Sequence, residues 1–372
     1  MSIETTMTRA WQRQAAWLWL LLPVSWLYGF ITMVRRQAYK IGLFASYRAP
    51  IPLMVIGNIT VGGSGKTPLI IALVTHLQKQ GIKVGVISRG YGGDSNQMPA
   101  LVHADSLPSI VGDEPCLIVN MTGAAMAVCP NRKQAITTLL NAHPDLQLII
   151  ADDGLQHYAL QRDIEWIVVD ASRGFGNQQL LPTGFLREPM SRLTGANVVY
   201  HEKADRTTKD NKQAKAKRLT MYLQADKLQP LWSSAVEIDG LSVAAKTLMP
   251  PIPNGRVHAV SGIGYPQRFF DTLMALGFDV IGHAYPDHYD FSLDELLQYS
   301  ELPIIVTSKD AVKIRALLIN MSSRQPLNDE YQELVHRLWV LPVTAALSDG
   351  CYVSLQQQLK ALNINLSKST KA

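Results

Sequence analysis

Cysteine and charge are both scarce in this chain of 372 residues. The three cysteines, Cys116, Cys129 and Cys351, include no C-x-x-C pair, which argues against a disulfide framework or a zinc site and favours a reducing cytoplasm. Charged residues make up only 17% of the sequence, below the roughly 25% usual for soluble domains, whereas 47% are hydrophobic. Some of the surface is therefore expected to meet lipid.

An even spread of positive charge is also missing. The net charge of +5 is concentrated in two segments: seven Lys and Arg lie between Lys203 and Arg218, and six lie in the first fifty residues. We interpret the 203–218 run as a solvated segment, because basic residues at every third position drift around a helix. Local charge favours an anionic membrane surface as partner. Neither a nucleic acid nor an obligate protein partner is expected.

The longest apolar run, residues 15–34, has twenty residues without a charge and basic residues on both sides. About 20 apolar residues suffice to span a bilayer. Four of the seven Trp lie between Trp11 and Trp26, and Pro23 interrupts the run, which favours a helix lying in the membrane interface. A true span and a buried helix of a soluble core are the alternatives. No A-x-A site follows closely, so no cleaved signal peptide is expected.

A phosphate-binding loop is predicted at residues 59–70, ITVGGSGKTPLI. Residues 51–58 before it have the β-branched composition of a strand, and the helix after it has Pro68 in its first turn and Gly81 at its end. Another strand is expected at 82–88. This order of strand, glycine-rich loop, helix and strand is the context that makes the motif a credible nucleotide site.

Each part of this loop has an expected role in binding ATP. Backbone N–H groups would face the phosphates, Lys66 would reach the β and γ phosphates, and the Thr67 hydroxyl would bind Mg²⁺. Thr60 stands where the usual pattern has glycine, but the following glycines still supply a permissive backbone. The predicted nucleotide-binding residues are Thr60, Val61, Gly62, Gly63, Ser64, Gly65, Lys66 and Thr67.

Two acids follow another apolar strand, within residues 145–157. Asp152 and Asp153 stand where a Walker-B acid belongs, beside the metal of the nucleotide. Adjacent residues of an extended strand point to opposite faces, so we expect one acid to face the metal and the other the acceptor or the structure. Further strands are expected at 163–170 and 196–200. Strands that alternate with helices predict a parallel sheet, with ligands at the carboxyl ends of its strands.

The second half of the chain forms a separate unit in this interpretation. A Pro-rich stretch at 248–255 indicates a linker, and strand, turn, helix and strand follow from residue 256. Gly262 and Gly264 indicate a tight turn, because the third glycine of a dinucleotide motif is missing. His288 is either a base poised near neutral pH or an ordinary surface histidine. Ser292 is expected to cap a helix, and residues 303–313 to form a strand that runs into a helix.

Eight motifs together identify a family resemblance. They occur in the order found in tetraacyldisaccharide 4'-kinases, the lipid A kinases of Gram-negative bacteria, over residues 15–345; Ser308 stands where the family usually has Glu. The phosphate loop alone also resembles those of MinD-like ATPases. The eight motifs are GNITVGGSGKTP, SRGYG, VGDEP, DDGLQH, LREP, SGIGxP, PDHYDF and TSKDAVK.

The resemblance implies transfer of the ATP γ-phosphate, with Mg²⁺, to the 4'-hydroxyl of a tetraacylated glucosamine disaccharide 1-phosphate at the cytoplasmic face of the inner membrane. It implies an α/β fold with a P-loop NTPase-like, mostly parallel sheet covered by helices on both faces, a smaller α/β/α lobe and an amphipathic membrane helix. The expected boundaries are 1–45 for the membrane segment, 46–220 for the P-loop lobe, 221–255 for a linker and 256–372 for the smaller lobe.

The resemblance also implies roles for individual residues. Asp113 and His288 resemble the pair that deprotonates the sugar hydroxyl, beside Lys66 as the third catalytic residue. Since the pair would come from two lobes, the base would form only when they close, which would limit ATP hydrolysis by water. The positions that match those near the metal are Asp152, Asp153, Glu188 and His157, together with Thr67.

Two rival classes remain in the sequence analysis. One is a membrane-associated ATPase switch of the MinD-like class, and the other is a lipid-binding module with a vestigial phosphate loop. The P-D-H-Y motif in a separate lobe argues against a switch, which has no need of it. The sequence leaves open whether Arg89 holds a phosphate and what Ser308 does.

Overall fold

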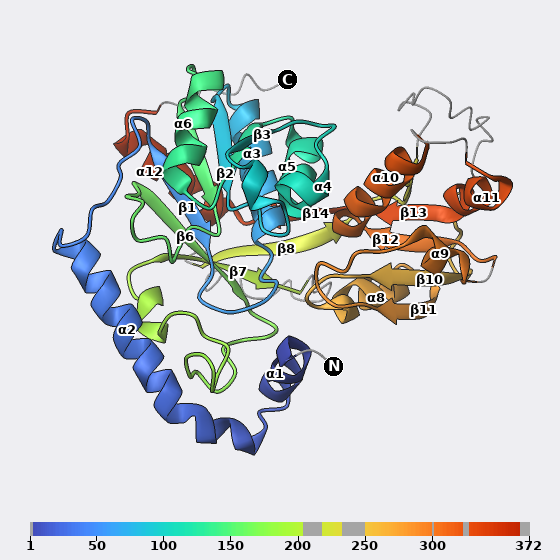
Figure 1. Cartoon of the computed structure of the whole chain (residues 1–372), viewed down its shortest axis with the longest axis horizontal. Coiled ribbons are helices and arrows are strands. Elements are labelled where there is room, and N and C mark those ends of the chain that lie inside the picture. The colour runs from blue at the N-terminus through green and yellow to red at the C-terminus, as the bar shows by residue number, and fades with distance from the viewer. Residues whose placement is uncertain (1–2, 204–217, 233–249, 300, 323–326, 365–372) are drawn as a thin grey trace.

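The computed structural model describes residues 3–203, 218–232, 250–299, 301–322 and 327–364, which form two lobes side by side (Figure 1). The larger lobe carries the phosphate loop, and the smaller lobe is built from the second half of the chain. Most of the basic run predicted at 203–218 and the middle of the expected linker lie outside the described residues.

A mostly parallel sheet forms the centre of the larger lobe. Its described strands run in the order β14–β8–β7–β6–β1–β5–β2–β4–β3, and of these β3 and β14 are antiparallel to their neighbours. The strands expected at 51–58, 82–88, 145–157, 163–170 and 196–200 are confirmed. The strands are β1 (Leu53–Gly57), β2 (Val84–Ser88), β3 (Ala100–Val102), β4 (Ala125–Val128), β5 (Leu148–Asp152), β6 (Ile164–Asp170), β7 (Asn197–Glu202), β8 (Leu219–Ala225) and β14 (Val343–Leu347).

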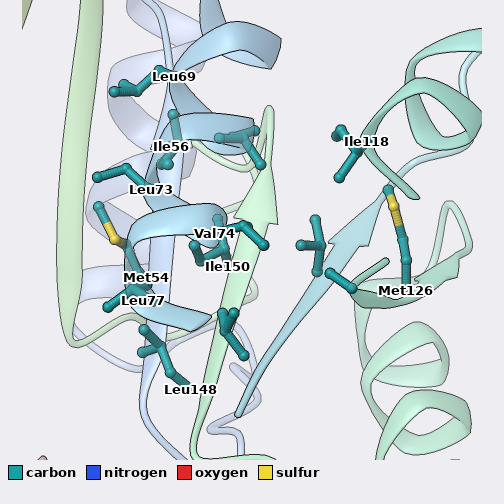
Figure 2. Packing of buried hydrophobic residues seen from close by; sticks show 14 of the residues in the cluster. Met54, Ile56, Leu69, Leu73, Val74, Leu77, Ile118, Met126, Leu148 and Ile150 are labelled. Carbon is teal, nitrogen blue, oxygen red and sulfur yellow. The ribbon is translucent and has the colours of Figure 1, made fainter. Parts of the chain in front are cut away.

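Helices cover both faces of this sheet. Helix α3 packs on one face through side chains spaced four residues apart, Leu69, Leu73 and Leu77, which meet Met54 and Ile56 of β1 (Figure 2). The alternate residues of β1 face α6 on the other side of the sheet. The helices of this lobe are α3 (Lys66–Lys79), α4 (Pro108–Val111), α5 (Asp113–Thr122), α6 (Arg132–Ala142) and α12 (Asp349–Ala361), with short 3-10 turns at Ser95–Gln97 and Met190–Leu193.

The apolar run near the N-terminus is helical and largely uncovered. After α1 (Ile3–Gln12), a 3-10 helix spans Ala16–Leu21 and α2 spans Leu22–Lys40, so Pro23 lies in the first turn of α2. Trp26 and Phe30 are 67% and 60% exposed, which rules out the alternative of a buried core helix. By length and composition alone, residues 16–40 could cross a membrane. Helix α2 runs along the outer edge of the larger lobe (Figure 1).

A second sheet, in the order β11–β10–β12–β13–β9, organises the smaller lobe. Helix α8 packs on one face, and α9, α10 and α11 pack on the other. The capping box at Ser292 and the strand that runs into a helix after residue 303 are confirmed. The elements are β9 (Gln229–Pro230), β10 (Arg256–Ser261), α8 (Pro266–Ala275), β11 (Asp279–Ala284), α9 (Leu293–Leu297), β12 (Ile304–Thr307), α10 (Ser308–Ser322), α11 (Asp329–Arg337) and β13 (Leu338–Leu341).

The lobes do not divide the chain where the sequence suggested. Strand β8 extends the larger sheet to residue 225, and β9, in the expected linker, belongs to the smaller sheet. After β13 the chain returns to the larger lobe, where β14 pairs with β8 and α12 buries Leu355 in the core. The boundaries of 46–220 and 256–372 therefore differ from the structure, because sheet membership depends on pairing between distant strands.

Helix α12 should stabilise the larger lobe although it lies at the far end of the chain. Leu355 is fully buried there, so Leu355→Ala should lower the free energy of unfolding by about 2–5 kcal/mol. Val353→Ala on the same helix removes a side chain that is 52% exposed and should change it by no more than about 0.5 kcal/mol. Denaturant unfolding measures both. In Leu355→Ala, amide hydrogen exchange should accelerate in β6–β8 of the larger lobe. Acceleration confined to the smaller lobe would contradict the assignment of α12 to the larger lobe.

Candidate active site

The phosphate loop turns at two glycines that have left-handed backbone conformations. Gly62 and Gly65 have φ of +92° and +94°, and α3 begins immediately after Gly65. A Cβ atom at Gly65 would lie 2.8 Å from Nδ1 of His201, so a side chain has no room there. These turns direct the loop toward the amino end of α3, where backbone N–H groups and the helix dipole favour anions.

Thr60 can replace the usual glycine because its backbone is not left-handed. The residue is buried and forms an isolated antiparallel bridge with Leu186. Next to it, the Val61 N–H donates a hydrogen bond of 2.9 Å to the carbonyl oxygen of Phe185. The entry to the loop is therefore held by a neighbouring extended segment, and its own conformation does not require glycine.

Lys66 is paired with an acid in the cleft that the phosphate loop lines. Its Nζ lies 3.4 Å from Oδ1 of Asp153, and the Arg187 guanidinium binds both oxygens of the same carboxylate at 2.8 and 3.1 Å. Burial raises the pKa of Asp153, but these two cations outweigh it and hold the pKa far below its usual range. Asp153 has φ of +46°, so it is not extended and its side chain lines the same cleft as Asp152. The extended geometry on which the expected opposite directions of the two acids depended is therefore not present at Asp153.

Asp152 ends β5 and is almost completely buried at the floor of the cleft. Its Oδ2 accepts a hydrogen bond of 3.3 Å from Ser88, whereas its Oδ1 is buried without a partner. Burial and the nearby charge of Glu114 raise the pKa of Asp152 to about 7. The Oδ1 atom of this carboxylate is therefore available to bind a cation.

The other residues expected near the metal have different surroundings. Glu188 is buried and bound by Arg192 and Gln156, each at 3.0 Å, behind the cleft wall that Gln156 lines. His157 lines the cleft, and burial together with nearby arginines lowers its pKa to about 4, so the ring is neutral. Within the described ranges, no three His, Cys, Asp or Glu side chains form a preformed metal-binding group.

Asp113 and His288 meet across the two lobes. Oδ2 of Asp113, in the first turn of α5, lies 3.0 Å from Nδ1 of His288, which follows β11. Burial raises the pKa of Asp113, but the hydrogen bond to His288 and the charge of Lys309 outweigh it and keep the acid ionised. In His288, burial lowers the pKa, but the hydrogen bond to Asp113 outweighs it and raises the pKa above its ordinary value. His288 also has φ of +59°, an uncommon conformation for a residue other than glycine.

Sequence reasoning missed several charged groups of the cleft. Lys309 of the smaller lobe pairs with Glu114 of the larger lobe at 3.3 Å and with Asp287 of its own lobe at 3.1 Å. The motifs that contain these two acids are evident in the sequence, but their pairing with Lys309 is not. At another point of the interface, Arg268 of α8 binds Asp170 at the end of β6, at 2.5 Å. Arg89 is exposed and lines the cleft. A signal was available for Lys309, the T-S-K-D motif itself, but the motif says nothing about its partners.

Comparison with known proteins identifies the family of this chain. A family model described as tetraacyldisaccharide-1-P 4'-kinase matches residues 17–360. The chain belongs to the tetraacyldisaccharide 4'-kinase family. It is 74% identical to the tetraacyldisaccharide 4'-kinase of Psychrobacter arcticus, over 99% of this chain and 98% of that one, and 43% identical to that of Stutzerimonas stutzeri, over 85% and 90%.

A solved structure is similar in fold. The chain resembles a crystal structure of LpxK from Aquifex aeolicus in complex with ATP, with a TM-score of 0.67 and 24% identity. The match covers 93% of this chain and 99% of that one, so both lobes of the family fold are present here. The expected α/β fold, with a P-loop lobe and a second lobe, is confirmed.

Gly65 and Gly63 provide a matched pair of substitutions in the phosphate loop. Gly65→Ala should weaken ATP binding about five- to thirtyfold, because a Cβ in the left-handed region costs about 1–2 kcal/mol and meets His201. Gly63→Ala should have a smaller effect, since its Cβ has nothing within 4 Å. Isothermal titration calorimetry with ATP compares them. Equal affinities for the two variants would contradict the role assigned to Gly65.

Proposed function

We propose that this kinase transfers the γ-phosphate of ATP to the 4'-hydroxyl of a tetraacylated glucosamine disaccharide 1-phosphate. The proposal rests chiefly on one observation, the 3.0 Å contact between Asp113 and His288 in the cleft that the phosphate loop lines. A carboxylate and an imidazole in this geometry are a general base, and a loop of this kind is a triphosphate site. The family name supplies the acceptor.

In the proposed reaction, the two residues divide the work of removing a proton. The hydroxyl of a sugar has a pKa far above 7, so its proton must leave as the oxygen attacks. Ionised Asp113 accepts a hydrogen bond from Nδ1 of His288, so Nε2 is the ring atom that takes that proton. The oxygen forms a bond to the γ-phosphorus while the bond to the bridging oxygen breaks, and ADP leaves with that electron pair.

Residues of the larger lobe would hold the triphosphate. Lys66 would exchange Asp153 for the β and γ phosphates, and the backbone of residues 62–66 would cradle them. Arg187 keeps Asp153 ionised after Lys66 has moved, because it binds both of its oxygens. Asp153 would therefore stay paired with Arg187 when Lys66 binds the phosphates.

The residues present fit a magnesium ion that arrives with the nucleotide. The buried Oδ1 of Asp152 has no partner, and burial together with the charge of Glu114 raises the pKa of this acid. Bound Mg²⁺ would neutralise charge on the phosphates, and it commonly takes only one or two protein carboxylates beside phosphate oxygens and water. We place Asp152 and Thr67 nearest to it, with Asp153 and His157 facing the same cleft and Glu188 behind Gln156.

The ATPase switch is the less favoured function. A switch that only hydrolyses ATP has no use for a base supplied by a second lobe and aligned with an aspartate of the first. Because Asp113 and His288 come from different lobes, separation of the lobes would dismantle the base and limit attack by water.

We further propose that α2 lies in the cytoplasmic surface of the inner membrane. Trp11, Ser25 and Tyr28 form hydrogen bonds of 2.8 to 3.0 Å with residues 182–187, so this part of the chain lies along the lobe, and its exposed apolar side chains face outward. A helix held against the lobe in this way favours the interface over a span. Basic residues at both ends suit anionic lipids, and the acyl chains of the substrate could stay in the bilayer.

The first test of the proposed function follows labelled phosphate from ATP into the lipid disaccharide. The chain should label the acceptor, and Asp113→Ala and His288→Ala should each lower kcat by about 10²-fold or more while ATP affinity changes little. Wild-type kcat/KM should fall as the pH drops through the raised pKa of His288, because only the neutral ring accepts a proton.

Controls distinguish the three functions. Lys66→Ala should abolish transfer in a kinase but would leave lipid binding and biological activity intact in a lipid-binding module. Label released only as free phosphate would support the ATPase switch. Near-normal turnover in both Asp113→Ala and His288→Ala would remove these residues from the chemistry.

The second test measures binding to vesicles that contain phosphatidylglycerol. A double substitution, Trp26→Ser with Phe30→Ser, should lower vesicle binding by about 10²-fold, because each buried aromatic side chain contributes about 1.5–3 kcal/mol. Ile252→Ser with Met274→Ser removes exposed apolar side chains from the smaller lobe and should leave binding unchanged. Equal loss in the two double variants would show that α2 is not the membrane-facing surface.

A further inference from the structure

Lys309 occupies the centre of the contact between the lobes. It lies in the first turn of α10, and its side chain is only 13% exposed. Its Nζ is 3.3 Å from Glu114 of the larger lobe, 3.1 Å from Asp287 and 3.2 Å from Nε2 of His288. One ammonium group therefore contacts carboxylates of both lobes and the ring of the proposed base.

The contact with Nε2 determines what Lys309 must do when an acceptor binds. Nδ1 of His288 is already engaged by Asp113, so Nε2 is the ring atom that must face the sugar hydroxyl. The Lys309 ammonium donates to that atom at 3.2 Å. It therefore occupies the position of the acceptor hydroxyl, and it must shift within the cleft when the acceptor arrives.

The surroundings of Glu114 indicate the direction of that shift. Glu114 lines the same cleft as Lys66 and Asp152, so it faces the part of the cleft where the phosphates are expected. Lys309 lies between Glu114 and His288, hence between the nucleotide end of the cleft and the base. A cation there is on the path that the γ-phosphoryl group takes to the acceptor oxygen.

We propose that Lys309 is a catalytic residue that binds the phosphoryl group in transit. In this structure its ammonium contacts Nε2 of His288, where the acceptor hydroxyl is expected; with both substrates bound it moves to a non-bridging oxygen of the γ-phosphoryl group. Lys309 donates hydrogen bonds and keeps its protons, while the hydroxyl proton goes to Nε2 of His288 and ADP takes the electron pair of the broken bond. This inference rests on the proposed function.

The rest of the T-S-K-D-A-V-K motif positions this lysine. Asp310 accepts hydrogen bonds from Thr307 Oγ1 at 2.7 Å and from the Gly262 N–H at 3.1 Å, which ties the start of α10 to the end of β10. Lys313 donates to the carbonyl oxygen of Tyr289 at 2.8 Å and so holds the loop that carries His288. The motif thus fixes both the lysine and the base, relative to each other.

Lys309 remains a cation despite its burial. Burial lowers the pKa of its ammonium, but Glu114, Asp113 and Asp287 outweigh it and hold the pKa well above its ordinary value. Other groups facing His288 are Asp113 from α5, Asp287 from its own loop and the ring edge of Tyr91, with Lys313 beside Asp113. Of these neighbours, Lys309 disfavours a charged imidazole, and the two carboxylates favour it.

The experiment compares Lys309→Met, Lys309→Arg and Asp287→Asn in the labelled transfer assay at saturating substrates. Lys309→Met should lower kcat by about 10²-fold or more with an ATP KM within about threefold of wild type, and Lys309→Arg should restore at least about a tenth of the rate. The acid limb of kcat/KM should move to higher pH in Lys309→Met and to lower pH in Asp287→Asn, because one loses a cation and the other an anion beside the same ring.

The outcomes separate this inference from the proposed function. A near-normal kcat in Lys309→Met overturns the inference, as does a lost rate with an unmoved acid limb, since a purely structural lysine would produce the latter. His288→Ala is measured in parallel. If it is inactive while Lys309→Met is normal, only the inference fails; if it is active, the proposed base itself fails.

Discussion

The contact between helices α5 and α10 is the constraint on which the rest of the site depends. It brings Asp113 to 3.0 Å from His288 and Glu114 to 3.3 Å from Lys309, and it joins the two hydrophobic cores, because Val312 of α10 packs into the core of the larger lobe. Neither lobe alone holds both the phosphate loop and the proposed base. The proposed chemistry therefore depends on the interface between the lobes.

Charges inside the cleft are paired so that substrates can replace the partners. Lys66 pairs with Asp153, and Lys309 pairs with Glu114 and Asp287, so each cation that we assign to a phosphate contacts a carboxylate in this structure. Exchanging a carboxylate for a phosphate changes the partner without exposing a bare buried charge, which would be costly. Asp152 is the exception, since one of its oxygens is buried without a partner.

Local sequence predicted what local geometry determines. The strand, loop and helix around Lys66 and the capping box at Ser292 depend on residues within a few positions of one another, and both are confirmed. The return of β14 to the larger sheet could not be predicted, because it depends on pairing with β8 more than a hundred positions earlier. For the same reason composition left His288 ambiguous: its partner, Asp113, lies 175 positions away, and only the family resemblance linked them.

The two passages of the chain between the lobes run together as one narrow ribbon. Val343 pairs with Ala225 at one end of it and Val340 with Gln229 at the other, and the Asp226 N–H donates to the Pro342 carbonyl oxygen between them at 3.0 Å. A pair of hydrogen-bonded strands resists stretching and sideways slip, but it bends and twists readily. Any parting of the lobes must then be a swing about this pivot, in which the groups farthest from it travel most and the ones beside it keep their spacing.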